Sequence, residues 1–562
     1  MAITQQWWKE AVIYQIYPRS FKDSNGDGIG DLRGIIQKLD YLKELGVDVL
    51  WLSPIYQSPN DDNGYDISDY YDIMNDFGNM EDFDEMLEGI HQRGMKLLMD
   101  LVVNHSSDEH KWFTESRKSK DNPYRDYYYW RPAKADGSKP TNWKAFFGGD
   151  AWEYDEQTEE YYLHLFTKKQ PDLNWENPKL RQEVYRIIRY WLDKGVDGFR
   201  MDVIPFISKR LPFEDVDPKR PFNDVAINTY ANGPRLHDFL QEMVRESVGH
   251  YDVMTVGEGI GVTPENGLLY VGEDRKELNM VFHFEHMFIN HGKGGKFDIV
   301  DFQLTDLKEG FSAWDGALGE KGWVNVYLDN HDFPRMVSRF GNDGKYHNES
   351  AKLLATLLLT LRGTPCIYQG SEIGMTNVAF PSIEDYRDVE TLNMYQEAKD
   401  RGEDMDAFLK AVHIQGRDNV RTPVQWSDEN HAGFTTGTPW IKANPNYPTI
   451  NAKAVLEDEK SIWYYYQQML QFRKEHIDVL VYGNYEVIDE NNQQVYAYKR
   501  SIEGKTMLVT LNFTSENQAF EVPYAVADLQ CLKGNYEGEI QGEEGNTLQL
   551  KPWEARVYLV SN

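Results

Sequence analysis

The sequence predicts an α/β protein built on a (β/α)8 TIM barrel, with a small inserted domain after the third strand and a C-terminal antiparallel β-sandwich domain. Eight short apolar runs recur over the first two-thirds of the chain, amphipathic helices lie between several of them, and polar residues follow many of the runs. Near-continuous hydrophobic strands that alternate with helices are typical of a parallel sheet buried on both faces. Eight such strands close into a barrel, whose chemistry lies at their C-terminal ends.

Each predicted strand is a short apolar run bounded by Gly or Asp. The eight strands are expected within residues 11–18, 47–54, 96–105, 196–203, 252–259, 279–286, 323–332 and 364–372. Amphipathic periodicity predicts helices over residues 31–46, 80–94, 177–195, 235–248 and 461–476. A doubly wound open sheet is the alternative, but no G-x-G-x-x-G motif follows the first strand. We therefore favour the barrel.

The spacing of the strands predicts the domain organisation. Far more residues separate the third and fourth strands than one helix needs, so residues 106–174 are expected to form an inserted domain that shapes the active-site pocket. The catalytic barrel then comprises residues 1–105 and 175–481, including a second long excursion at about 374–455. Residues 482–562 carry alternating patterns that predict a C-terminal β domain.

Composition excludes several classes of function. The net charge of −32 argues against nucleic acid and against polyanionic substrates, because both need a basic surface. The aromatic content of 14% suits a surface that stacks on sugar faces. Two cysteines cannot build a disulfide scaffold or a cysteine-based zinc site. With no signal peptide and no apolar run of membrane-spanning length, we expect a cytoplasmic protein without a membrane partner, as a monomer or weak homo-oligomer.

Three acids stand at the ends of predicted strands: Asp202, Glu258 and Asp332. His105 and His331 lie beside them. Buried like charges are unfavourable unless the protein uses them. Cleavage of a glycosidic bond needs one carboxylate to attack or stabilise an oxocarbenium-like centre and one carboxylic acid to protonate the leaving oxygen. The pattern therefore predicts a glycoside-cleaving site.

The neighbours of two acids suggest their roles. Arg200 precedes Asp202 by two positions, so both side chains face the same side of the strand. A guanidinium there is expected to keep Asp202 ionised and nucleophilic. Glu258 follows an apolar run and lies near other acids, which is expected to raise its pKa and suit it to acid/base catalysis.

Five motifs then point to a family. "DLVVNH", "QPDLNW", "GFRMDV", "VGEG" and "LDNHD" occur in the order and spacing of the α-amylase family of glycoside hydrolases (family 13), and the chain resembles its α-glucosidase and oligo-1,6-glucosidase subgroup along essentially its whole length. The resemblance implies that Asp202 is the nucleophile of a retaining double displacement, Glu258 the general acid/base and Asp332 the third acid. It further implies a set of substrate-binding residues: Tyr65, Asp66, His105, Phe147, Phe166, Gln170, Arg200, Val203, His331 and Arg417.

The activity implied by this resemblance is that of an exo-acting α-glucosidase. It would release glucose from the non-reducing ends of isomaltose and short isomalto-oligosaccharides, with an α-1,6 preference that overlaps with α-1,4 bonds and sucrose. Val203 carries the linkage assignment, because Val after the nucleophile resembles α-1,6-specific relatives. A sucrose or trehalose isomerase on the same scaffold is the alternative. A non-catalytic transporter partner is disfavoured, because all three acids are retained and no membrane span is visible.

The loop "DSNGDGIGD", residues 23–31, has the oxygen spacing of a calcium-binding loop. Its twelfth position is Gly34 instead of the bidentate Glu of a calcium sensor, so a switch is not expected. The family resemblance implies a structural Ca²⁺ or Mg²⁺ site and no organic cofactor. The ligands would be the side chains of Asp23, Asn25, Asp27 and Asp31 and the carbonyl of Ile29. An Asp-rich turn without metal is the alternative.

Overall fold

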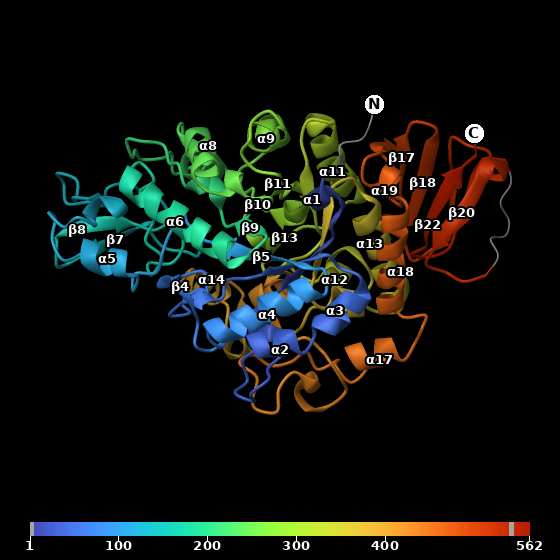
Figure 1. Ribbon diagram of the computed structural model, residues 1–562, viewed down its shortest axis with the longest axis horizontal. Coiled ribbons are helices and arrows are strands. Elements are labelled where there is room, and N and C mark those ends of the chain that lie inside the picture. The colour runs from blue at the N-terminus through green and yellow to red at the C-terminus, as the bar shows by residue number, and fades with distance from the viewer. Residues whose placement is uncertain (1–4, 539–544, 562) are drawn as a thin grey trace.

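The computed structural model describes residues 5–538 and 545–561 (Figure 1). Its centre is a closed barrel with the strand order β1-β15-β14-β11-β10-β9-β5-β2. All eight neighbouring pairs are parallel, so their carboxyl ends open on one face. The strands are β1 (Ile13–Ile16), β2 (Val49–Leu52), β5 (Lys96–Leu101), β9 (Gly198–Met201), β10 (Met254–Glu258), β11 (Met280–Phe282), β14 (Val324–Val326) and β15 (Thr364–Tyr368). Each lies within one predicted strand segment, which confirms the barrel.

Four predicted helices are present as single elements. They are α4 (Met80–Gln92), α6 (Pro178–Lys194), α8 (Leu236–Glu246) and α18 (Ile462–Glu475). The single helix predicted over residues 31–46 is wrong, because the chain forms α2 (Leu32–Ile36) and α3 (Leu39–Leu45) with a break at Lys38. The two halves pack on different neighbours, α2 on α4 and α3 on α18, and periodicity alone does not reveal that change of partner.

The segment between β5 and α6 folds beside the catalytic face of the barrel. It contains α5 (Lys111–Ser116) and a three-stranded sheet of β6 (Trp130–Arg131), β8 (Glu160–Leu163) and β7 (Trp152–Asp155). Isolated bridges join His105 to Asp172 and Tyr128 to Leu173, so the segment begins and ends next to the end of β5. Figure 1 shows α5, β7 and β8 at the end of the molecule opposite the C-terminal sheet.

Further helices and strand pairs fill the other connections. The remaining helices are α1 (Trp7–Glu10), α7 (Phe222–Val225), α9 (Pro264–Val271), α10 (Glu285–Phe288), α11 (Leu304–Leu318), α12 (Met336–Phe340), α13 (His347–Thr360), α14 (Val389–Asp400), α15 (Met405–Gln415), α16 (Asp418–Arg421), α17 (Ala452–Leu456) and α19 (Ile477–Leu480). Outside the barrel lie the paired strands β3 (Tyr56–Gln57) with β4 (Asp69–Ile73), and β12 (His291–Gly292) with β13 (Gly295–Ile299).

The C-terminal domain is an antiparallel β structure, as predicted. Its main sheet has the order β16-β17-β18-β22-β20, and β19 pairs with β21 in a second sheet. The strands are β16 (Asn484–Ile488), β17 (Val495–Ile502), β18 (Lys505–Asn512), β19 (Gln518–Glu521), β20 (Leu529–Gly534), β21 (Thr547–Leu550) and β22 (Ala555–Val560). One apolar cluster joins the two sheets, including Leu508 from one and Phe520 and Leu548 from the other. Residues 539–544 and 562 of the predicted domain lie outside the described residues.

Candidate active site

One arginine holds two of the predicted catalytic acids. Arg200 lies in β9, Asp202 directly follows that strand, and Glu258 ends the neighbouring strand β10. Arg200 Nη1 donates to Asp202 Oδ1 at 2.8 Å, and its Nη2 lies 2.8 Å from Glu258 Oε2. Asp202 and Glu258 are thus each held 2.8 Å from a terminal nitrogen of one guanidinium. The barrel therefore brings the two acids to the same cation.

Another buried acid, Asp100 on β5, binds the same guanidinium. Its two carboxylate oxygens accept from Arg200 Nη1 at 2.8 and 3.0 Å. Tyr65 donates its hydroxyl to Asp100 Oδ2 at 3.1 Å. The sequence analysis did not single out Asp100, although a charged residue within an apolar strand was a usable signal, since Asp is almost never buried unless it is paired.

Burial shifts the pKa values of the acids in this cluster. Burial raises the pKa of Asp202 well above its usual range, against the opposing effect of Arg200. Burial also raises the pKa of Glu258, as predicted, and that of Asp100 to about 6. The expectation that Arg200 keeps Asp202 ionised stays a prediction, because Arg200 lowers the pKa of Asp202 whereas burial, Glu258 and Asp100 raise it. Asp202 and Glu258 lie on one guanidinium and are expected to titrate as a pair.

Val203 connects the nucleophile to the acid/base through its backbone. Its N–H donates to Glu258 Oε2 at 2.8 Å, and its φ of 34° lies in the left-handed region. A β-branched residue there is a conformational outlier. The side chain of Val203 is buried in an apolar cluster with Phe147 and Phe166. The residue that carries the linkage assignment thus also orients Glu258.

Asp332 stands in a different electrostatic environment. Its Oδ1 accepts from Arg421 Nη2 at 2.9 Å and from Arg417 Nη1 at 3.3 Å, and its Oδ2 lies 3.3 Å from His331 Nε2. Burial alone would raise its pKa, but these three neighbours outweigh burial and hold it well below the usual range. Burial lowers the pKa of His331 to about 3, so the imidazole is neutral at pH 7 and the arginines keep Asp332 ionised.

Asp388 completes this arginine cluster. Its Oδ1 accepts from Arg417 Nε at 2.8 Å and lies 2.5 Å from Arg417 Nη2, while Arg421 Nη1 lies 3.4 Å away. Its Oδ2 caps the N-terminus of α14 through Thr391. The sequence analysis missed Arg421 and Asp388. Arg421 follows Arg417 by four positions, which was a usable signal, whereas nothing distinguished Asp388 from other acids in a long loop.

The predicted sugar-binding residues on the other side of the site lie together. The Tyr65 ring stacks on His331 with a centroid distance of 5.3 Å, and its hydroxyl lies 2.7 Å from His331 Nε2. His105 Nε2 lies 3.1 Å from the Tyr65 carbonyl oxygen and 3.3 Å from Gln170 Nε2. The Phe166 ring packs against His105 at 5.1 Å. These side chains contact one another, and Tyr65 links them to Asp100 beside Arg200.

Asp66 lies differently from the other predicted residues. Its Oδ1 accepts from Ser58 and from the backbone of Asp62, and its Oδ2 accepts from the backbone of Asp61. Its carboxylate thus organises its own loop. The acid of this loop that contacts other site residues is Asp62, which lies 3.4 Å from Arg417 Nη2 and accepts from Gln170 at 3.1 Å. Burial raises the pKa of Asp62 to about 7.

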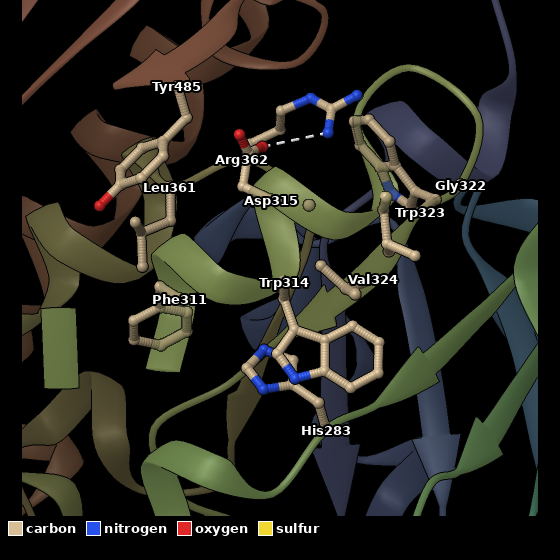
Figure 2. Close-up of a pocket in the computed structure, with 12 residues that line it drawn as sticks. His283, Phe311, Trp314, Asp315, Gly322, Trp323, Val324, Leu361, Arg362 and Tyr485 are labelled. Carbon is tan, nitrogen blue, oxygen red and sulfur yellow. Dashed lines mark hydrogen bonds and ion pairs between the residues drawn. The ribbon is translucent and has the colours of Figure 1, made fainter. Parts of the chain in front are cut away.

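A separate cavity lies away from these acids (Figure 2). It is lined by residues of α11, β14 and the C-terminal domain, including Trp314, Val324, Tyr485 and the ion pair between Arg362 and Asp315. None of the predicted catalytic acids is among its lining residues. Its volume of about 20 Å³ suits one water molecule, far less than a sugar ring needs. We therefore place no substrate there.

The loop at residues 23–31 is held by its own hydrogen bonds. Asp23 accepts from the backbone of Asn25, Gly26 and Gly28. Asp31 accepts from Ser24 and from the backbone of Gly34, where it caps α2. In the part of the chain that the structure describes, no three His, Cys, Asp or Glu side chains lie close enough to hold a metal ion.

The oxygen atoms of this loop are nevertheless of the kind that ligate a hard cation. Asn25 Oδ1 accepts from the Asp27 backbone and Asp27 Oδ1 from the Ile29 backbone, so both oxygens face into the loop. Side-chain and carbonyl oxygens are the ligands that Ca²⁺ and Mg²⁺ prefer.

Comparisons with known proteins agree with this geometry. The family model described as alpha amylase, catalytic domain, matches residues 15–483. The chain belongs to the α-amylase family. A model of the maltogenic amylase C-terminal domain matches residues 485–557. An oligo-1,6-glucosidase of Parageobacillus thermoglucosidasius is 60% identical, and one of Bacillus cereus is 58% identical, each with 99% of both chains covered. These findings confirm the resemblance that the five motifs indicated.

Solved structures of related enzymes share the whole fold. An isomaltulose synthase variant from Erwinia rhapontici NX5, in complex with sucrose, has a TM-score of 0.96 and 44% identity over 100% of both chains. A trehalulose synthase from Pseudomonas mesoacidophila MX-45 has a TM-score of 0.96 and 46% identity over 100% of both chains. One scaffold therefore serves hydrolases and isomerases, so fold alone does not decide between them. Among residues 5–538 and 545–561, no helix is long and apolar enough to cross a membrane.

Proposed function

We propose that this protein is an exo-acting retaining α-glucosidase that releases glucose from isomaltose and short isomalto-oligosaccharides. The observation that carries the proposal is the binding of Asp202 and Glu258 to the two terminal nitrogens of one guanidinium, each at 2.8 Å. Retaining glycosidases hold their two carboxyls about 5–5.5 Å apart, whereas inverting enzymes leave about 6.5–9.5 Å for a water. Two acids that bind the two terminal nitrogens of one guanidinium match the shorter separation. Release of glucose from isomaltose by the purified protein tests this proposal.

Hydrolysis with retention needs one acid of the pair to be ionised and the other to be protonated. Asp202 attacks the anomeric carbon, a bond forms between its Oδ and C1, and the bond from C1 to the leaving oxygen breaks. Glu258 gives a proton to the leaving oxygen, and the burial that raises its pKa favours the protonated form that this step needs. Glu258 then takes a proton from water, whose oxygen attacks C1 and releases Asp202.

The remaining residues suit a single terminal glucose unit. Asp332 stays ionised between two arginines and offers a permanent acceptor for sugar hydroxyls. Asp62, His105 and Gln170 supply further polar groups beside the Tyr65 and His331 rings. A site that surrounds one sugar with charged hydrogen-bonding groups favours cleavage from the chain end.

Val203 supports the α-1,6 preference, because its buried side chain lies directly after the nucleophile. Replacing Val203 with Thr is expected to raise the ratio of kcat/KM for maltose to that for isomaltose by about 10–200-fold, the range that one side-chain change in a pocket can produce. Initial rates on both disaccharides measure this ratio. Val225→Thr is the matched control, because Val225 lies buried in the same apolar cluster. A wild-type protein that prefers maltose to isomaltose contradicts the linkage assignment.

An isomerase is the second candidate, favoured by the close structural similarity to sucrose-converting enzymes. Such enzymes return the glucosyl unit to another hydroxyl of the fructose instead of to water. Incubation with sucrose separates the two reactions, because hydrolysis yields glucose and fructose, whereas isomerisation yields isomaltulose or trehalulose. The relatives named as oligo-1,6-glucosidases, at higher identity, favour hydrolysis.

The loop at residues 23–31 is proposed as a structural Ca²⁺ or Mg²⁺ site, supported by its oxygen donors. Adding Ca²⁺ to chelator-treated protein is expected to raise the unfolding temperature with concentration, because a ligand at 100 times its Kd stabilises the folded state by about 2.7 kcal/mol. Differential scanning calorimetry measures the shift. Asp27→Ala is expected to abolish it, whereas an unfolding temperature that Ca²⁺ and Mg²⁺ leave unchanged contradicts the site. The cytoplasmic location and the oligomeric state stay predictions.

A further inference from the structure

Helix α14 contacts the active site through its N-cap residue and the inserted domain further along its length. Its capping residue Asp388 binds Arg417 with one oxygen and Thr391 with the other. Further along the helix, Asn393 Nδ2 donates to the Phe147 carbonyl oxygen at 3.0 Å. Glu397 Oε1 accepts from the Gly149 backbone N–H at 3.0 Å. These two contacts span 246 and 248 positions of sequence and join two separate excursions of the chain.

The loop that α14 contacts carries an aromatic wall of the site. The Phe147 ring lies 4.6 Å from the Arg417 guanidinium and 5.5 Å from the Phe166 ring. Gly148 and Gly149 follow with φ of 91° and 76°, so the backbone bends sharply behind the phenylalanine. A Cβ built on Gly148 would lie 2.6 Å from Glu397 Oε1, which shows how closely the helix approaches the loop. One helix thus fixes both partners of the contact between Arg417 and Phe147.

We propose that Asn393 and Glu397 are positioning residues that latch the Phe147 loop to α14 and so set the affinity for the terminal glucose unit. The inference rests on the proposed α-glucosidase function. Neither residue touches the reacting atoms, and both lie near the protein surface. Without the latch, the Gly148–Gly149 bend is free to swing outward, and Phe147 no longer packs on Arg417. Arg417, which also binds Asp388 and Asp332, then loses this packing contact.

The double variant Asn393→Ala/Glu397→Ala tests the latch. We expect its KM for isomaltose and its Kd for D-glucose, measured by calorimetry, to rise roughly 5–20-fold, since two modest hydrogen bonds are lost. The kcat should stay within twofold and the unfolding temperature should stay unchanged, because no buried group is removed. Glu397→Gln keeps an acceptor oxygen for Gly149 and is expected to behave as wild type. Gln396→Ala is the matched control, because Gln396 is exposed on the same helix and bonds to Asp400.

Gly148→Ala provides an independent test from the other side of the contact. Its Cβ would displace Glu397, so it is expected to raise KM in the wild-type background and to raise it less in the Glu397→Ala background. Wild-type KM and Kd in the double variant would overturn the latch, as would full additivity of the Gly148 and Glu397 changes. Failure of the wild-type protein to bind glucose or hydrolyse any α-glucoside would instead overturn the proposed function.

Discussion

Replacing Glu258 with Gln is expected to lower kcat on isomaltose by about 10²–10⁴-fold, the usual contribution of a positioned general acid/base. The variant keeps an oxygen that can accept from Val203 N–H and Arg200, so the local geometry survives while the transferable proton is lost. Because burial raises the pKa of Glu258, the acid form of the wild type persists to higher pH than in a free carboxyl. The alkaline limb of the pH profile that this group sets should disappear in the variant.

The control for this prediction is Glu277→Gln. Glu277 is also buried, but it pairs with His237, Gln241 and Arg275 away from the catalytic acids, and its variant is expected to keep kcat within a few-fold. An aryl α-glucoside with an acidic phenol releases that phenol without needing a proton. The rate of the first step of the Glu258 variant is therefore expected to return towards the wild-type rate on such a substrate. A kcat on isomaltose within threefold of the wild-type value in Glu258→Gln would contradict the assignment of Glu258 as the acid/base.

Replacing Asp332 with Asn is expected to reduce kcat/KM on isomaltose by roughly 10²–10⁴-fold. Asp332 keeps its charge beside partner arginines, and each hydrogen bond from a sugar hydroxyl to such a charged acceptor contributes about 1.5–3 kcal/mol. Here the partners are Arg417 and Arg421, which would be left with Asp388 alone as a close shared acid. The same two arginines hold Asp332 ionised, so the wild-type contribution of this group does not titrate near neutral pH. Steady-state kinetics on isomaltose measure the loss.

Asp329→Asn is the matched control for this second prediction. Asp329 is buried near the same strand end, but it accepts from Ser371 and from the Met336 backbone and takes no part in the arginine cluster. Asn keeps those acceptor contacts, so its activity should stay within a few-fold of wild type. A folded Asp332→Asn protein that loses less than tenfold in kcat/KM contradicts the role of the third acid.

The sequence predicts the barrel well because the strands are buried on both faces and so read as continuous apolar runs. The same logic placed Asp202, Glu258 and Arg200 together, since neighbouring parallel strands end on one face. The protonation of the pair was not predictable from Arg200 alone, because Asp100 competes for the same guanidinium from a third strand. Patterns along one strand do not show which charges a closed barrel brings into contact.

The long loops were less predictable than the strands. Asp62 and Asp388 bind Arg417 from segments more than 300 residues apart, and neither segment has a periodicity that fixes side-chain direction. Asp66 was predicted to bind the sugar together with its neighbour Tyr65, yet its carboxylate oxygens accept hydrogen bonds from its own loop. The latch residues on α14 carried no signal, because exposed Asn and Glu on a helix usually face only solvent.

Covalent trapping tests the central claim most directly. The claim is that Asp202 as nucleophile and Glu258 as general acid/base act on the same glucose unit. A fluorinated α-glucosyl fluoride forms the glycosyl-enzyme faster than water removes it, and peptide mass spectrometry then locates the label. We predict one fluoroglucosyl group per chain, attached to Asp202 and absent from Asp202→Asn. Label on another side chain, or none on a protein that hydrolyses isomaltose, would contradict the account.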